Sequence, residues 1–192
     1  MTAKTVSVVV AFHSGYGHTT RMAEATCDGA ASVDGVAAEL LTLDELTEDK
    51  WARLDAADAM IFGSPTYMGS ASPQFHTFAH ATSGRWFAQA WKDKVAAGFT
   101  TSGAMSGDKL NTLQYFTILA AQHGMHWVNL DLPPGTAETE LNRLGGWLGA
   151  MGRCPGDQGP EAMSEADLLT AAHLGRRVAD HALLLSRARL SI

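Results

Sequence analysis

The amino-acid sequence predicts an α/β protein in which a doubly wound, five-stranded parallel sheet carries helices on both faces. Short apolar, β-branched runs alternate along the chain with segments of helical character. The apolar runs are nearly continuous, as expected for strands that are buried on both faces of a parallel sheet. Proline and glycine stand at several junctions between the segments, where the chain must turn. Strands that alternate with helices in this way imply βαβ crossovers.

The first half of the chain supplies three strands and three helices. The strands are expected at residues 5–12, 36–43 and 58–64, and the helices at residues 18–32, 44–54 and 72–83. The third strand stops at Pro65, because proline cannot donate a hydrogen bond to a neighbouring strand. Asp44 stands where it can cap the second helix. Ser72-Pro73 opens the third helix with proline at its first position, where the missing N–H group is tolerated.

The second half supplies two more strands and two more helices. The strands are expected at residues 94–101 and 125–130, and the helices at residues 108–123 and 163–188. Gly124 follows the first of these helices and is a natural C-cap. The stretch from 131 to 162 is expected to be irregular, because it contains Pro133-Pro134-Gly135 and six further glycines. A loop of this length in a compact domain is usually functional or disordered.

The composition narrows the class of protein. The chain has 192 residues, so we expect residues 1–192 to form a single domain. Its net charge is −6 and it has no basic cluster, so it lacks the electrostatic footprint of a nucleic-acid-binding protein. No apolar run is long enough to cross a bilayer, and the N-terminus lacks the pattern of a signal peptide. Cys27 and Cys154 form no disulfide framework or metal motif, and we expect a cytoplasmic location.

The first loop with chemical character is His13-Ser-Gly-Tyr-Gly-His-Thr-Thr20, which follows the first strand. Gly15 and Gly17 allow the backbone to curl so that successive N–H groups point inward, and Ser14 and Thr19 add hydroxyl donors. The helix that follows contributes the positive end of its dipole. Together these groups form a nest for a phosphate. The spacing fits neither a dinucleotide fingerprint nor a Walker A loop, and the alternative is a polar turn that caps a helix.

Two further loops lie at the same edge of the predicted sheet, where open α/β sheets bind ligands. Gly63-Ser-Pro-Thr-Tyr-Met-Gly-Ser-Ala-Ser-Pro73 follows the third strand, and its Tyr67 and Met68 are suited to packing on a ring system. Thr100-Thr-Ser-Gly-Ala-Met-Ser-Gly-Asp108 follows the fourth strand and offers hydroxyl and main-chain N–H groups to the polar edge of a ring. One phosphate nest beside two ring-binding loops predicts a site for a mononucleotide with a large flat base.

At these residues the sequence resembles the flavodoxin-like superfamily, and within it the WrbA-type NAD(P)H:quinone oxidoreductases and the NADPH-dependent FMN reductase-like proteins. The similarity extends from about residue 5 to 130 and, more weakly, over 145–185. The motifs that carry it are Ser14-Gly-Tyr-Gly-His18, Phe62-Gly-Ser-Pro-Thr-Tyr-Met-Gly69, Ser83-Gly-Arg-Trp86, Thr100-Thr-Ser-Gly103 and Gln122-His-Gly-Met125. The resemblance implies a flavodoxin-like fold and FMN as the cofactor, with its phosphate on the first motif and its ring on the second.

The resemblance also implies an activity and a set of site residues. The activity is the FMN-dependent transfer of electrons from NADH or NADPH to a quinone or a similar small acceptor, by a ping-pong mechanism, in a homodimer or homotetramer. His123 and Tyr67 are expected to position or protonate the acceptor, and Trp86 joins His123 where subunits meet. The residues expected to hold FMN are Ser14, Gly15, Tyr16, Gly17, His18, Thr19, Pro65, Thr66, Tyr67, Met68, Gly69, Thr100, Thr101, Ser102, Gly103, Gly107, Trp86 and His123.

Several alternatives stay open at this point. A flavodoxin-type carrier of single electrons, or a redox-sensing FMN-binding module without its own substrate, fits the same site. On sequence alone His123 is also a helix-capping histidine and Trp86 a core residue. His76 and His80 share one face of a helix, but no third ligand accompanies them, so no metal is expected. Residues 103–109 superficially resemble a P-loop, but their glycine spacing is one residue short, and we exclude a nucleotide triphosphate site.

Overall fold

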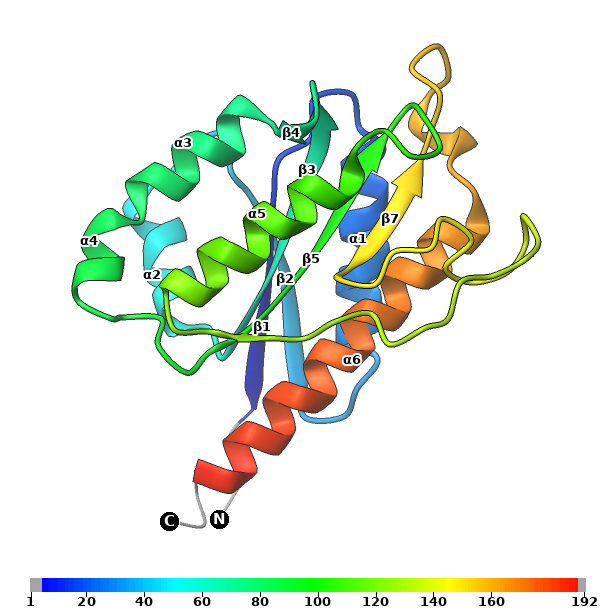
Figure 1. Ribbon diagram of the computed structural model, residues 1–192. Coiled ribbons are helices and arrows are strands. Elements are labelled where there is room, and N and C mark those ends of the chain that lie inside the picture. The colour runs from blue at the N-terminus through cyan, green and yellow to red at the C-terminus, as the bar shows by residue number, and fades with distance from the viewer. Residues whose placement is uncertain (1–4, 190–192) are drawn as a thin grey trace.

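The computed structural model describes residues 5–189 and shows a parallel sheet between two layers of helices (Figure 1). The strands are β1 (Val6–Phe12), β2 (Val36–Thr42), β3 (Ala59–Tyr67), β4 (Ser70–Ala71), β5 (Val95–Ser102), β6 (His126–Trp127) and β7 (Ala150–Arg153). The helices are α1 (His18–Ala31), α2 (Glu48–Ala56), α3 (Pro73–Ala81), α4 (Ser83–Phe87), α5 (Lys109–Gln122), the 3₁₀ turn η1 (Pro160–Ala162) and α6 (Glu165–Arg189). Within residues 5–189, no helix has the length and apolar character that are needed to span a membrane.

The sheet has the order β2-β1-β3-β5-β6, and every pair along this path is parallel. β1 pairs with β2 from Val6 opposite Val36 to Phe12 opposite Thr42. The chain adds β2 on one side of β1 and β3 on the other, so the direction of winding reverses between β1 and β3. This topology confirms the predicted doubly wound parallel sheet. It also places the ligand crevice at the carboxyl ends of β1 and β3.

The central strand β1 is buried on both of its faces. Val8 and Val10 belong to one apolar cluster, together with side chains of α1 and α6. Val9 and Ala11 belong to a second cluster on the opposite face, together with side chains of α2, α3 and α5. All four residues have no exposed surface. Because successive side chains enter opposite cores, the strand has a continuous apolar sequence rather than an alternating one.

Helices α1 and α6 lie against each other on one face of the sheet, and two glycines permit their close approach. A Cβ atom at Gly175 would lie 1.9 Å from the carbonyl oxygen of Thr26. A Cβ atom at Gly29 would lie 2.0 Å from the carbonyl oxygen of Ala172. Neither distance is possible for a real side chain, so only glycine fits at the two positions. The contact fixes α6 against the helix that begins directly after the first loop.

The fifth position in the sheet differs from the expectation. The sequence predicts one strand at 125–130, but only the two-residue β6 pairs with the first residues of β5. The carboxyl half of β5 pairs instead with β7, which lies inside the segment 131–162, where the sequence predicts irregular structure. A hydrogen bond from the Leu130 N–H to the Trp147 carbonyl (3.1 Å) closes the base of the excursion between β6 and β7. Strands this short show no readable periodicity, which explains the wrong prediction.

Two helix boundaries also differ from the expectation. Asp44 does not cap α2; the N-cap is Thr47, whose side chain accepts a hydrogen bond from the Lys50 N–H (3.3 Å). Asp44 lies instead 3.6 Å from the Nε2 atom of His13, across the end of β1. The single helix expected at 72–83 is two helices, α3 and α4, that meet at Thr82. The predicted start of the helix at Ser72-Pro73 is confirmed, with Pro73 as the first residue of α3, and the Ser72 side chain caps the helix by accepting a hydrogen bond from an N–H group of its first turn.

Candidate functional site

The three predicted loops meet at the carboxyl ends of β1, β3 and β5 and enclose a pocket of about 330 Å³. The pocket is lined by Tyr16, His18, Thr19, Pro65, Thr66, Tyr67, Thr101, Ser102, Gly103, Cys154 and Gly156. All of these except the last two are residues that the sequence predicts as contacts of the cofactor. Other predicted contacts lie in the same three loops but do not line the pocket: Ser14, Gly15, Gly17, Met68, Gly69, Thr100 and Gly107.

The first loop presents main-chain donors that have no partner. Gly17 adopts a left-handed conformation (φ 86°) and begins α1 without a side-chain cap. The Oγ atom of Ser14 accepts a hydrogen bond from the Gly17 N–H (3.1 Å), which holds the turn in shape. In the part of the chain that the structure describes, the N–H groups of Tyr16, His18 and Thr19 bond to no acceptor. Free N–H groups at the start of a helix are a ready site for an anion.

Buried threonine hydroxyls join the three loops behind the pocket. The Oγ1 atoms of Thr19 and Thr101 lie 2.8 Å apart. The Oγ1 atom of Thr66 lies 2.8 Å from those of both Thr100 and Thr112. All five side chains are buried, and each hydroxyl has a hydrogen-bonding partner, as a buried polar group requires. The hydroxyls therefore fix the ends of β3 and β5 and the start of α1 relative to one another.

Two tyrosines form the aromatic rim of the pocket. The rings of Tyr16 and Tyr67 lie edge to face, with 6.4 Å between their centroids. Tyr16 is 76% exposed, and Met68 beside Tyr67 is fully exposed with a positive φ of 48°. Partial burial, with a smaller contribution from Tyr16, raises the pKa of the Tyr67 phenol. A Cβ atom at Gly15 would lie 2.5 Å from the Tyr67 hydroxyl oxygen, so a glycine there lets the phenol reach the first loop.

The third loop, residues 102–108, folds back on itself at the end of β5. The Ser102 hydroxyl donates a hydrogen bond to the Ala104 carbonyl (3.0 Å). Gly107 has a positive φ of 56°, and a Cβ atom there would lie 2.2 Å from the Ser102 Oγ atom. The tight fold of the loop places Ser102 and Gly103 on the wall of the pocket.

The segment after β7 completes the pocket, and the sequence does not predict this contribution. Cys154 and Gly156 line the pocket, and the Nε2 atom of His18 lies 2.9 Å from the Gln158 carbonyl oxygen. Burial is the main cause that raises the pKa of the Cys154 thiol, so this thiol stays protonated near neutral pH. No signal in the sequence separates these residues from their glycine-rich surroundings, because their role depends on the unpredicted strand β7.

His123 and Trp86 do not line the pocket of their own chain, so the contact with a flavin that the resemblance implies would have to form where subunits meet. Helix α5 runs back across the sheet from the end of β5, so His123, which follows it, lies near the amino ends of the strands. Its side chain is 1% exposed, with Nε2 2.9 Å from the Thr82 Oγ1 atom and its ring 4.7 Å from Trp91. Burial lowers the pKa of His123. Trp86 lies on α4 near the same end of the sheet and is half exposed.

His76, one of the two histidines on α3, contacts other side chains of the protein. The Nε2 atom of His76 lies 3.1 Å from the Ser70 Oγ atom, and its ring packs against Tyr115 with 4.5 Å between centroids. Among residues 5–189, no three side chains of the metal-binding types come together in a way that would hold a metal ion.

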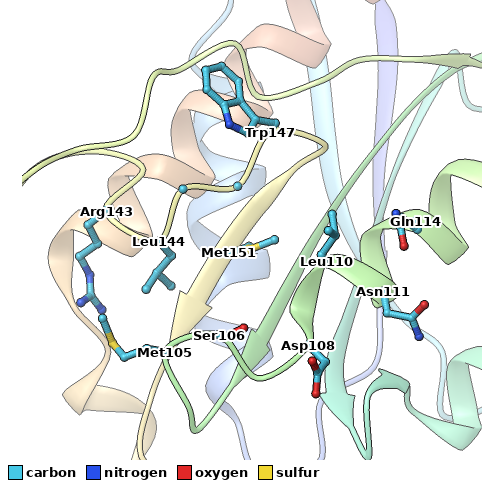
Figure 2. A pocket seen from close by; sticks show the side chains of 12 residues that line it. Met105, Ser106, Asp108, Leu110, Asn111, Gln114, Arg143, Leu144, Trp147 and Met151 are labelled. Carbon is cyan, nitrogen blue, oxygen red and sulfur yellow. The ribbon is translucent and has the colours of Figure 1, made fainter.

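A larger groove of about 680 Å³ lies on the other side of the third loop (Figure 2). Its walls come from the third loop, from the first turns of α5 and from the segment between Arg143 and Met151, which includes Trp147. The groove does not contain the free N–H groups of the first loop or the tyrosine rim. The smaller pocket, where the three predicted loops meet, is therefore the candidate site for the cofactor.

The smaller pocket fits FMN by the chemistry of its groups. The unpaired N–H groups of Tyr16, His18 and Thr19 match the oxygens of a phosphate. The tyrosine rim offers aromatic surface to a flat ring. The hydroxyl of Ser102 and the main chain of Gly103 offer polar contacts to the edge of that ring. The pocket has no carboxylate among its lining residues, so nothing there repels an anionic mononucleotide.

Comparisons with known proteins agree with the fold and the site. The family described as NADPH-dependent FMN reductase matches residues 9–132. Flavodoxin FldP of Pseudomonas aeruginosa is 42% identical over 178 residues, which are 89% of this chain and 94% of that protein. An NAD(P)H dehydrogenase (quinone) of Geotalea uraniireducens is 32% identical over 206 residues, which are 95% of this chain and 100% of that protein. The crystal structure of a flavodoxin, WrbA-like protein from Agrobacterium tumefaciens has a TM-score of 0.77 and 46% identity, over 93% of this chain and 98% of that one.

The fold and the site define a flavodoxin-like flavoprotein with FMN as its cofactor. The chain belongs to the NADPH-dependent FMN reductase family, whose electron donor is NAD(P)H. The expected resemblance to WrbA-type proteins, the flavodoxin-like fold and the cofactor are thereby confirmed.

Proposed function

We propose that this protein passes electrons from NAD(P)H through FMN to a quinone or a similar small acceptor, by a ping-pong mechanism. The observation that carries the proposal is the junction of an anion nest and an aromatic-rimmed pocket at the switch point of the sheet. The name of the Geotalea relative, NAD(P)H dehydrogenase (quinone), supports the choice of acceptor. Because the flavin ring would lie at an open rim, donor and acceptor would use the same face in turn.

The residues of this chain bind and orient the cofactor rather than react with it. The main-chain N–H groups of the first loop would hold the phosphate, and the threonine hydroxyls keep the three loops in register. Tyr16 and Tyr67 would cover part of the ring and exclude water from it. When bound, FMN supplies the redox chemistry by accepting a hydride from NAD(P)H and returning two electrons to the acceptor.

Tyr67 is the side chain that we assign to positioning the acceptor. Its phenol lies at the rim of the pocket, against the first loop. Its pKa is raised by burial, so the hydroxyl keeps its proton at physiological pH and can donate a hydrogen bond to a quinone oxygen. We do not assign this role to His123, because its side chain is buried beside Thr82 near the opposite edge of the sheet.

A second candidate function is that of an electron carrier. The observation that favours it is the aromatic rim that Tyr16 and Tyr67 form, since carriers hold the flavin against aromatic residues. The relative Flavodoxin FldP, at 42% identity, supports this alternative. A carrier would exchange electrons with protein partners and would react slowly with free NAD(P)H.

The experiment that separates these functions is an anaerobic titration of the FMN-loaded protein. NADH or NADPH should bleach the flavin rapidly, and benzoquinone should restore its colour with two electrons for each flavin. A yellow protein that neither nicotinamide reduces, and that accepts single electrons from dithionite, would be a carrier and would contradict the enzyme proposal.

We further propose that a second copy of the chain covers α5 and the groove beside it (Figure 2). Residues 110–122 and 144–152 contain no Asp, Glu, Lys or Arg, although 18% of the whole chain is charged. On this face Leu110, Ile118 and Trp147 are each more than half exposed. Exposed apolar surfaces that lack charge are typical of protein interfaces. Because the chain has a net charge of −6, two copies meet with the least repulsion at a face that has few charges, and the charged residues that line this groove are Asp108 and Arg143, of opposite sign.

Trp86 and Phe87 form a second exposed apolar surface on α4, where their exposed fractions are 48% and 85%. A tetramer with two kinds of symmetric contact needs two such faces. Trp86 can contact a flavin only if that flavin is bound by another copy, since its own pocket lies at the other end of the sheet.

A further inference from the structure

Lys109 is a fully buried cation behind the third loop. It is the first residue of α5 and has no exposed surface. Its Nζ atom donates hydrogen bonds to the Ser102 Oγ atom (2.8 Å), the Ala104 carbonyl (2.8 Å) and the Met105 carbonyl (3.0 Å). An ammonium group has three protons, and the loop supplies an acceptor for each of them.

The position of Lys109 is unfavourable for a cation on general grounds. Removing a charged amine from water costs several kcal/mol unless it is paired and fully hydrogen-bonded. The N-terminal end of a helix also repels positive charge. The hydrogen bonds to the third loop offset these costs only in the observed geometry. The charged form of Lys109 is therefore stable only when residues 102–108 adopt this one conformation.

The start of the third loop is held by β7 and the residue after it, through hydrogen bonds from Arg153 to the Gly103 carbonyl (3.2 Å) and from the Cys154 N–H to the Ser102 carbonyl (3.1 Å). The carbonyls of Ala104 and Met105, further along the loop, are held by Lys109. Met105, Ser106 and Asp108 line the larger groove, where the loop borders open space (Figure 2). On the opposite side Ser102 lines the cofactor pocket, so one hydrogen bond separates the ammonium group from the pocket wall. Loss of the three Lys109 hydrogen bonds would loosen the loop directly after Ser102 and Gly103, which line the pocket.

Three charged groups from other elements act on the ammonium group. Asp167 of α6 favours the charged form, whereas Arg143 and Arg153, from the segments around β7, oppose it. Asp167 is itself occupied by a paired hydrogen bond with Arg143 (both N···O distances 2.8 Å). Burial is the largest cause of the change in the pKa of Lys109, which falls from its ordinary value of 10.5 to about 8.

We propose that Lys109 is a positioning residue for the cofactor, which shapes the third loop against the pocket and supplies a buried positive charge that favours an anionic mononucleotide. The inference rests on FMN as the cofactor but not on the identity of the electron acceptor. The affinity for FMN should then depend on the protonation of this amine. Bound FMN favours the charged amine, so affinity is full below pH 8 and weakens as pH rises above it.

The test measures the dissociation constant of FMN by fluorescence quenching between pH 6.5 and 9.5, without donor or acceptor. Across this range the phosphate of FMN changes charge only near the lower limit, since its second pKa is about 6. For the wild-type protein we expect affinity to fall several-fold above pH 8. Lys109→Met should weaken binding at pH 7 by roughly tenfold, as expected for two unit charges about 12 Å apart at an effective dielectric constant of about 20, and should remove the fall above pH 8.

Two further variants separate charge from packing. Lys109→Arg keeps the charge at every pH of the titration, so its affinity should not fall above pH 8. Lys92→Met removes an exposed lysine near the amino ends of the strands and should behave as wild type. Amide hydrogen exchange of the cofactor-free protein should be faster over residues 102–108 in Lys109→Met. In the wild-type protein, exchange over residues 102–108 should also accelerate above pH 8 by more than the hydroxide catalysis that affects all amides.

The pH titration of the wild-type protein tests the proposal even if a variant does not fold. A wild-type affinity that stays constant from pH 7 to 9.5 would overturn the proposal without any variant. Equal pH profiles for wild type and Lys109→Met would also overturn it. If the pH profile is as expected but the loaded protein reduces no quinone, Lys109 keeps its assigned role and only the proposed acceptor is wrong.

Discussion

Tyr67 combines a position at the mouth of the pocket with a phenol that keeps its proton. Replacing it with phenylalanine removes one hydroxyl and leaves the ring in place. We expect Tyr67→Phe to lower kcat/KM for a quinone by about tenfold, the effect of one hydrogen bond of roughly 1 to 1.5 kcal/mol. Steady-state kinetics with a saturating nicotinamide would measure it. FMN affinity should change by less than about twofold, because the aromatic surface is retained.

Tyr16 supplies the matched control for this experiment, since its ring lies edge to face with that of Tyr67. Tyr16→Phe should leave the quinone kinetics unchanged. Equal losses in the two variants would mean that the rim acts only by covering the ring, and the assigned role of Tyr67 would be wrong.

The variant His123→Ala tests a residue that stabilises the fold rather than one that lines the pocket. Truncation to alanine leaves the buried Thr82 hydroxyl without this partner, so we expect a loss of about 1 to 3 kcal/mol in the free energy of unfolding. Turnover per bound FMN should not change. A large loss of turnover at full FMN occupancy would restore a role in the reaction, through another copy of the chain.

The pH dependence of stability has a definite sign at His123. Burial lowers the pKa of His123 in the folded chain below its ordinary value of 6.5, so the unfolded chain binds the proton more readily. The stabilisation is therefore complete above pH 6.5 and is lost as the pH falls below it. Denaturant titrations at pH 5 and pH 7.5 should show a smaller difference for His123→Ala than for the wild type.

Helices α1 and α6 depend on the absence of a side chain where they meet. Gly175→Ala would place a Cβ atom 1.9 Å from the Thr26 carbonyl oxygen, so the helices must separate. We expect a loss of about 3 kcal/mol, at the upper end for an overpacked core. Gly84→Ala is the control, because a Cβ atom on α4 meets nothing within 4 Å. It should be neutral or stabilising by up to about 0.5 kcal/mol, and thermal or denaturant unfolding would compare the two.

The sequence predicts long elements well because their patterns repeat. β1, β3 and β5 are buried on both faces and have continuous apolar sequences, and the loops at their ends contain the glycines and hydroxyls of the cofactor pocket. The division of the sheet position beside β5 between the two short strands β6 and β7 is not predictable in this way. β6 and β7 have two and four residues, and they form because β5 offers an unpaired edge, which is a property of the assembled sheet.

The same distinction holds within the pocket. The residues of the three loops could be assigned because each follows directly after a strand. Cys154 and Gly156 could not, since they enter only through β7. In the sequence, Lys109 stands out only as part of an incomplete phosphate-binding pattern. Its contacts to its own loop depend on the backbone conformation of residues 102–108, which that pattern does not predict.

At the scale of the whole molecule, the uncharged face of α5 predicts how copies of the chain associate. Ile118→Glu introduces a charge at a residue that is 59% exposed, so the isolated fold should tolerate it. We expect this variant to reduce the mass measured by light scattering after size exclusion, because a charge buried between copies is costly. Leu184→Glu on α6, where the side chain is 62% exposed, should leave the mass unchanged.

The wild-type protein sets the reference for that comparison. A wild-type chain that is monomeric at all concentrations would contradict the proposed association. An oligomer that dissociates with Phe87→Glu but not with Ile118→Glu would assign the contact to α4 instead.

The excursion between β6 and β7 leaves and rejoins the same neighbouring strand within a short distance. The chain departs beside Ala96 and returns beside Phe99, and the Leu130–Trp147 hydrogen bond closes the base. Extra sequence placed near its tip would add little closure entropy, because that cost grows only with the logarithm of loop length. This segment is therefore a natural point for grafting a foreign peptide or a small domain onto the protein, with the flavin pocket left intact as an internal colour reporter of correct folding.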